Sequence, residues 1–299
     1  STSSDREQTT IYPADRIKTR LVEYDLQPND FGLGEFPEVI ILKGKKGGFF
    51  EKSGMQQYED TPLTNKMRSE VEKINDWLVK MEIDIAADGI SSETNINNRK
   101  LRRYFGRGDL TFGSGGRLFG GFWLDMSKNQ RRDYLWLGEE GICTLDFDNL
   151  GPTILYSIAG KTPPEGDAYT LPHYERYRSG VKTIFSTMTF TDKPLERFPK
   201  GVKKEFEEDY RLHWITNSIE QKHRPIFHLL NSQIGHKIQR IESDIIIKAL
   251  LLAMGEDIPA LPVHDALLFP KSKKEEGIRI MTTAFKEVTG ADGTIKEEL

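Results

Sequence analysis

The sequence contains one cysteine, Cys143, and it lacks any long apolar run. A single cysteine excludes an internal disulfide and favours a reducing compartment. No stretch approaches the roughly 18 consecutive apolar residues of a membrane-spanning helix, and no signal-peptide pattern opens the chain. We therefore expect a cytoplasmic protein that has no membrane partner.

An excess of positive charge is also absent, because the formal net charge is −4. Nucleic-acid-binding proteins are often strongly basic, so this value counts against that class. Basic clusters nevertheless occur at residues 43–46, 99–103 and 131–132. Any one of them is more often a solvated face than a binding site, although local clusters shape the surface potential more than the sum does. The hydrophobic share of 37% and the charged share of 29% are those of an ordinary globular protein.

Two aspartates, Asp146 and Asp265, each end or interrupt an apolar run that predicts a buried strand. Burying an unpaired carboxylate is costly, and a divalent cation is a partner that two carboxylates can share. Arg178 and Lys182 lie between them in the sequence, one helical turn apart. Two acids and two bases in this arrangement indicate chemistry on a phosphate. The alternative is that the acids form structural ion pairs with Arg117, Arg178 or Lys182.

Hydrophobic periodicity predicts several helices and several short strands. The predicted helices span residues 64–82, 175–190 and 231–254, with a further short helix between Pro152 and Gly160. Thr64 or Asn65 is the expected cap of the first helix. Strands are predicted at 38–43 and 142–147, and two more over 258–270 turn at His264-Asp265.

The remaining segments carry weaker signals. Residues 83–98 are polar and predict a loop that separates an N-terminal portion from the rest. The glycines of 113–121 predict either a close backbone approach or a plain flexible turn. The charged tail, 273–299, is expected to begin as a helix and to be exposed.

In this order, the segments resemble the polymerase module of family A DNA polymerases, the DNA polymerase I class, and their single-subunit phage RNA polymerase relatives. Residues 139–150, with Asp146, resemble motif A, and residues 263–269, with His264 and Asp265, resemble motif C. Arg178, Lys182 and Phe190 fit motif B, the nucleotide-facing fingers helix. Residues 239–246, which begin with Gln239, are similar to the helix ahead of motif C, and residues 115–118 to a Gly-Arg element. The resemblance spans 115–269 and leaves 1–95 unexplained.

The resemblance implies an α+β fold, in which an antiparallel palm sheet carries reduced helical fingers and a reduced thumb. Lys182 follows Asp146 by only 36 residues, so the fingers are short. We expect an N-terminal region with a small thumb-like helix (1–95), a first palm part with motif A (96–160), reduced fingers with motif B (161–230), and a second palm part with motif C and the tail (231–299).

The resemblance also implies roles for particular residues. Two Mg²⁺ ions, or Mn²⁺, are expected on Asp146, Asp265 and the backbone of Phe147. Asp146, Asp265 and Lys182 are the expected catalytic residues. The expected nucleotide-binding residues are Arg178, Lys182, Phe190 and Gly151, and the expected nucleic-acid-binding residues are Arg117, Gln239 and His264.

The implied function is template-directed nucleotidyl transfer, with a primer-template and nucleoside triphosphates as partners. Several positions depart from the DNA polymerase pattern: Gly151 replaces a glutamate that excludes ribonucleotides, Phe190 a tyrosine, Ala266 a glutamate and Ser186 an aromatic residue. Primase or RNA polymerase activity, or a non-catalytic nucleic-acid-binding accessory role in replication, are the alternatives. The short chain indicates a mobile-element, plasmid or phage protein in a bacterial or phage-infected cell, with a possible small replication partner protein.

Overall fold

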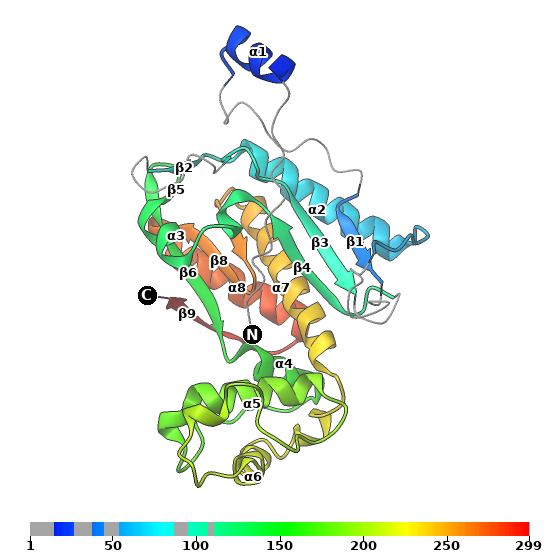
Figure 1. Ribbon diagram of the computed structural model, residues 1–299, viewed down its shortest axis with the longest axis vertical. Coiled ribbons are helices and arrows are strands. Elements are labelled where there is room, and N and C mark those ends of the chain that lie inside the picture. The colour runs from blue at the N-terminus through cyan, green and yellow to red at the C-terminus, as the bar shows by residue number, and fades with distance from the viewer. Residues whose placement is uncertain (1–14, 27–37, 45–53, 87–94, 107–110, 299) are drawn as a thin grey trace.

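The computed structural model describes residues 15–26, 38–44, 54–86, 95–106 and 111–298, and the fold is α+β, as predicted. Figure 1 shows an upper body of sheets and long helices above a smaller helical lobe formed around α5 and α6. Lys45, Lys46 and the middle of the predicted 83–98 boundary lie outside the described residues. No helix of the described chain is both long enough and apolar enough to cross a membrane.

The first sheet has three strands and is covered on one face by two helices. β1 (Ile40–Lys43) runs parallel to β3 (Leu101–Gly106), and β3 pairs antiparallel with β4 (Gly115–Gly120). α2 (Pro62–Lys80) packs on β1 and β3, and α7 (Gly235–Gly255) packs on β4 (Figure 1). Gly116 lets α7 pack closely on β4, because a Cβ at this position would lie 3.1 Å from Ser243 Oγ on α7. The predicted close backbone approach is therefore the correct reading of this glycine-rich segment.

The second sheet is antiparallel throughout and has the strand order β2-β5-β6-β8-β7, with β9 also paired to β6. Its strands are β2 (Ile83–Ile85), β5 (Leu135–Leu137), β6 (Glu140–Asp148), β7 (Leu261–Val263), β8 (Ala266–Pro270) and β9 (Thr294–Glu298). α7 contacts β7, and α8 (Lys274–Thr289) contacts β6, β8 and β9. The predicted hairpin over 258–270 and its placement beside the Asp146 strand are confirmed.

The remaining helices are short. α1 (Asp15–Glu23) lies apart from the body in Figure 1, and α3 (Lys128–Tyr134) precedes β5. α4 (Leu150–Ile158) follows β6 directly, and α5 (Arg178–Phe190) and α6 (Leu212–Lys222) form the lower lobe. Single 3₁₀ turns occur at Phe122–Leu124, Glu175–Tyr177, Lys203–Glu205, Phe227–Leu229 and Lys271–Lys273.

Two helix starts were predicted wrongly. Thr61, not Thr64 or Asn65, caps α2: its hydroxyl accepts from the Thr64 amide (3.1 Å), while Thr64 Oγ1 accepts from the Thr61 amide (2.7 Å). This reciprocal pair is a capping box, and it leaves Thr64 inside the first turn. α7 starts at Gly235 instead of 231, because Asn231 and Gln233 have φ values of 57° and 60° and cannot belong to the helix.

Two segments predicted as loop or tail are structured. Ile83–Ile85 form β2, at the start of the predicted 83–98 loop, and pair with β5. The tail after 273 is not simply exposed, because α8 buries Ile280, Met281, Ala284 and Phe285 against the body and β9 joins the sheet. The buried positions recur every three to four residues, which is the pattern of an amphipathic helix.

Candidate active site

Strand pairing brings the two predicted aspartates to one edge of the second sheet. Asp146 lies near the end of β6 and pairs with Ala266 on β8, while Asp265 occupies the turn between β7 and β8. His264 has a φ of 58°, which lets the chain reverse within two residues. The two carboxylates are therefore neighbours in space although 119 positions apart in the sequence.

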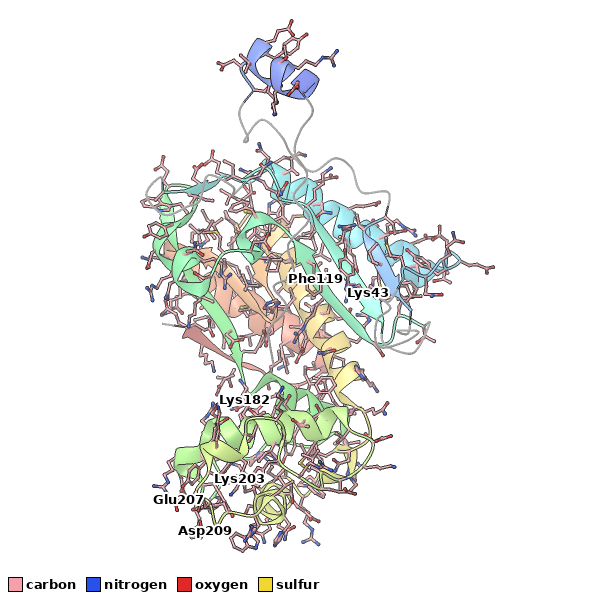
Figure 2. The ribbon with its side chains drawn as sticks, viewed as in Figure 1. Lys43, Phe119, Lys182, Lys203, Glu207 and Asp209 are labelled. Atoms are coloured by element: carbon pink, nitrogen blue, oxygen red, sulfur yellow. The ribbon has the colours of Figure 1, made fainter. Side chains whose placement is uncertain are left out.

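These carboxylates open into a cavity of about 380 Å³ between the sheet, α4, α5 and α7. The cavity collects predicted site residues from five separate stretches of the chain: Arg117, Asp146, Phe147, Gly151, Arg178, Lys182, Phe190, Gln239 and Asp265. Figure 2 shows Lys182 on α5, at the upper side of the lower lobe, toward the end of β6. His264, also predicted, lies in the exposed hairpin turn and is not among the described residues that line the cavity.

Asp146 is a strongly perturbed acid of the cavity. Burial raises its pKa to about 6, and the nearby charges of Asp265 and Glu298 act in the same direction, against Lys296 and the Phe147 amide. Its Oδ1 is buried and accepts no hydrogen bond from the described part of the chain. Buried polar atoms are nearly always bonded, so an orphaned carboxylate oxygen in a cavity indicates a missing partner.

A divalent ion fits this missing partner. Among the described residues, no three carboxylate, imidazole or thiolate groups converge into a complete protein cage. Mg²⁺ does not require one, because it is commonly held by one or two carboxylates together with water and substrate phosphates. Asp146 with its unbonded oxygen, Asp265, and the Phe147 carbonyl are thus a donor set that suits Mg²⁺ bound together with a phosphate-bearing substrate.

The opposite wall of the cavity is basic and is carried by α5. Arg178 forms an ion pair with Asp167, whose other oxygen accepts from Thr170 Oγ1 at 2.7 Å. The ring of Tyr169 lies below both cations, 5.4 Å from the Arg178 guanidinium carbon and 5.8 Å from Lys182 Nζ. Arg178 is therefore held in place by its own lobe, while the exposed Lys182 keeps its ammonium group available.

Two positions on α5 and α4 shape the space around these groups. Gly151 meets no other atom within 4 Å of where a Cβ would stand, so this part of the cavity is open. Phe190 is 38% exposed and packs edge-on against His236 at 5.2 Å between ring centroids. A Cβ at Gly235 would lie 2.7 Å from the Phe190 ring, so this glycine lets the ring reach its position.

Sequence reasoning missed several residues that line the cavity, among them Glu242, Lys296 and Tyr169. Glu242 on α7 has a side chain only 13% exposed and accepts from Arg117 Nη2 at 3.2 Å; burial and Asp265 raise its pKa, against Arg117. Its i+3 spacing from Gln239 is a signal that could have found it. Lys296 on β9 pairs with Asp146 across the sheet and forms an ion pair with Asp148 at 3.2 Å. Tyr169 carried no signal, because it follows a loop.

The raised pKa of Asp146 predicts a pH-dependent stability. Because its pKa is near 6 when folded and near 3.8 when unfolded, the folded state binds more protons between these values. Its contribution to stability is therefore fully present below about pH 4 and is lost as the pH rises through about 6. Urea unfolding from pH 4 to 7.5 measures this, and Asp146→Asn is expected to flatten the fall. An Asp192→Asn control, at an exposed aspartate, should show the same fall in the free energy of unfolding as the native chain. If Asp146→Asn shows that same fall with rising pH, the prediction is contradicted.

The comparisons with known proteins find similarity among solved structures alone. No family model matches the chain, and no curated protein matches it. Among solved structures, the chain is similar to the POL domain of Pol1 from M. smegmatis in complex with DNA primer-template and dNTP, at 12% identity and a TM-score of 0.42. The match covers 79% of this chain and 52% of that one, so this chain spans about half the length of that domain. A similarity at this level assigns no function, and the chemistry rests on the cavity itself.

Proposed function

We propose that this cavity catalyses template-directed nucleotidyl transfer by a two-metal mechanism. The observation that carries the proposal is the buried, unbonded carboxylate oxygen of Asp146 beside Asp265, across one cavity from Arg178 and Lys182. Extension of a nucleic acid chain requires an activated 3′-oxygen and a neutralised pyrophosphate leaving group. The carboxylates of this arrangement would hold the metal ions for the first requirement, and its cationic side chains meet the second.

Each residue has a distinct role in this proposal. Asp146, Asp265 and the Phe147 carbonyl would hold two Mg²⁺ ions, or Mn²⁺, and the bound metal would supply Lewis acidity toward the attacking hydroxyl and positive charge for the triphosphate. Arg178, oriented by Asp167, binds the triphosphate through its remaining donors. Lys182 binds the same group and donates a proton to the departing pyrophosphate.

The nucleic acid contacts in this proposal come from the other side of the cavity. Arg117 on β4 and Gln239 on α7 line it, and His264 is exposed at the hairpin turn where a primer end would reach Asp265. Residues 161–230 act as the reduced fingers, residues 96–160 and 231–299 as the palm, and α2 as the small thumb. A small replication partner protein remains part of the proposal for a chain with so short a thumb.

The open space at Gly151 favours a second candidate, primase or RNA polymerase activity. Gly151 lines the cavity without a side chain, at the position where the resemblance to DNA polymerases implies a glutamate that excludes ribonucleotides. Phe190 also has no hydroxyl to read the sugar. Ribonucleotide use is therefore the variant of the same chemistry that this cavity leaves open.

Primer extension tests the proposal directly. A labelled primer-template is incubated with Mg²⁺ or Mn²⁺ in parallel reactions with dNTPs and NTPs, beside an Asp265→Ala control. Template-dependent extension that disappears in the control supports the proposal, and the two nucleotide sets give the sugar preference. If no condition supports extension although the protein binds the primer-template, the chain has the accessory role instead.

Replacement of Lys182 separates triphosphate chemistry from nucleic acid binding. Lys182→Ala is expected to lower kcat by about 10²- to 10⁴-fold, the usual contribution of a general acid, with little effect on the Kd for primer-template. Lys193→Ala, at an exposed lysine outside the cavity lining, is the matched control. Equal rates for both variants in single-turnover incorporation would remove Lys182 from the mechanism.

A further inference from the structure

The outward face of β3 and β4 carries an exposed aromatic and basic surface. Along β3, Leu101, Arg103 and Phe105 are buried, so the alternate residues Arg102 and Tyr104 face the other way. Along β4, Leu118 is buried between Arg117 and Phe119. α2 and α7 cover the opposite face of this sheet. Figure 2 shows Phe119 and Lys43 close to β3 and β4. We name this surface the β3–β4 platform (Lys43, Arg102, Tyr104, Arg117 and Phe119).

The platform residues contact one another in a way that holds two rings between cations. Arg102 pairs with Phe119 across the strands, and Tyr104 pairs with Arg117. The rings of Tyr104 and Phe119 meet edge-to-face, with centroids 5.3 Å apart and planes at 89°. Lys43 Nζ lies 4.6 Å from the Tyr104 centroid, and the Arg102 guanidinium carbon lies at 5.8 Å.

Phe119 is 47% exposed although it is a large apolar ring. An apolar ring flanked by Lys and Arg suits a partner that is both planar and anionic. Single-stranded nucleic acid is such a partner, because its bases stack on aromatic rings while its phosphates bind cations. A duplex fits less well, since its bases are stacked on one another and expose only their edges.

The platform is continuous with the candidate active site. Arg117 belongs to both: it pairs with Tyr104 on the sheet, and it lines the cavity beside Glu242 and Asp265. Phe119 is two residues farther along β4, about 7 Å away at the usual strand rise. A strand that leaves the cavity past Arg117 therefore meets Phe119 and Tyr104 next.

We propose that the β3–β4 platform binds a single nucleic acid strand, with bases stacked on Phe119 and Tyr104, and leads it to or from the cavity. This proposal rests on the proposed function for the identity of the partner as a nucleic acid. The platform acts by stacking, so it tolerates any base sequence. It also explains how a chain with a net charge of −4 binds nucleic acid, because the cations concentrate locally.

Oligonucleotide binding by the full chain tests the platform. In fluorescence anisotropy with a labelled dT₁₂ probe, Phe119→Ala is expected to raise the Kd by about 5- to 100-fold, the range for loss of stacking on one base. Trp214→Ala is the matched control, since Trp214 is similarly exposed (46%) but lies on α6. Phe119→Trp is expected to keep the native affinity, and thermal melting confirms that each variant is folded.

A second probe makes the stacking itself measurable. A dT₁₂ probe with several consecutive abasic positions is expected to bind the native chain more weakly than dT₁₂ does. This difference in affinity is expected to be smaller for Phe119→Ala, in which Tyr104 is the remaining stacking ring. A blunt duplex of equal length should be insensitive to Phe119→Ala. If Phe119→Ala leaves dT₁₂ binding unchanged, or weakens the duplex equally, the platform is not a single-strand site and a protein partner becomes the occupant to seek.

The outcomes separate this proposal from the proposed function. Binding is measured without metal or nucleotide, so it does not depend on catalysis. Platform-dependent binding without any primer extension supports the platform and rejects the polymerase. Extension with no effect of Phe119→Ala on single-strand binding supports the polymerase and rejects the platform.

Discussion

Asp265→Asn is expected to reduce nucleotide incorporation by about 10³-fold or more while the protein stays folded. Metal-assisted stabilisation of the transition state is worth several kcal/mol, and each 1.36 kcal/mol corresponds to tenfold in rate. In the proposed mechanism, Asp265 supplies one of the two carboxylates for this stabilisation, and no third acid of the described chain converges with them into a metal cage. Single-turnover incorporation under saturating primer-template is the measurement.

The stability of the same variant should not fall. Asp265 raises the pKa of Asp146, which means that the two carboxylates repel each other in the folded protein. Removing one charge relieves this repulsion, so the melting temperature is expected to stay constant or to rise. Asp192→Asn, at an exposed aspartate outside the cavity lining, is the control for both measurements. Asp265→Asn with undiminished incorporation would falsify the two-metal assignment.

Arg103→Ala is expected to lose about 1–3 kcal/mol of the free energy of unfolding, the range for leaving buried hydrogen-bond partners without their donor. The Arg103 side chain is fully buried, and burial lowers its pKa to about 10, so it remains charged at neutral pH. Its Nε donates to the Gly116 carbonyl at 2.9 Å and to Ser243 Oγ at 3.0 Å, and its Nη2 donates to Asp244 at 2.7 Å. One side chain thus joins β3, β4 and α7.

Urea unfolding measures this loss, with Arg132→Ala as the control. Arg132 is half-exposed and pairs with its neighbour Asp133 at 2.8 Å, and an exposed ion pair of this kind contributes little to stability. Since α7 also carries Gln239 and Glu242, any folded Arg103→Ala protein should bind primer-template less tightly than the control. A loss below about 1 kcal/mol would show that Arg240, which also pairs with Asp244, replaces Arg103.

Local patterns in the sequence were sufficient for the elements that carry the cavity. The apolar runs around Asp146 and Asp265 predicted β6 and the β7–β8 hairpin, because an alternating or continuous apolar stretch has only a few ways to be buried. The four-residue spacing of Arg178 and Lys182 predicted a shared helix face for the same reason. The order of these elements carried the resemblance to the polymerase module, and the structure brings nine of the ten predicted site residues to one cavity.

The tertiary structure alone decided which other residues join the nine predicted residues in the cavity. Lys296 reaches the cavity because β9 pairs with β6 across 150 positions, and Tyr169 because its segment packs under α5. Glu242 on α7 forms an ion pair with Arg117 on β4 of the first sheet. The exposed rings of Tyr104 and Phe119 meet because of the register between β3 and β4. Periodicity reports which face of an element is apolar, but not which element covers it. That choice depends on long-range pairing and packing. The sequence by itself therefore determined the elements that carry the two aspartates and the basic helix, and the fold determined their surroundings.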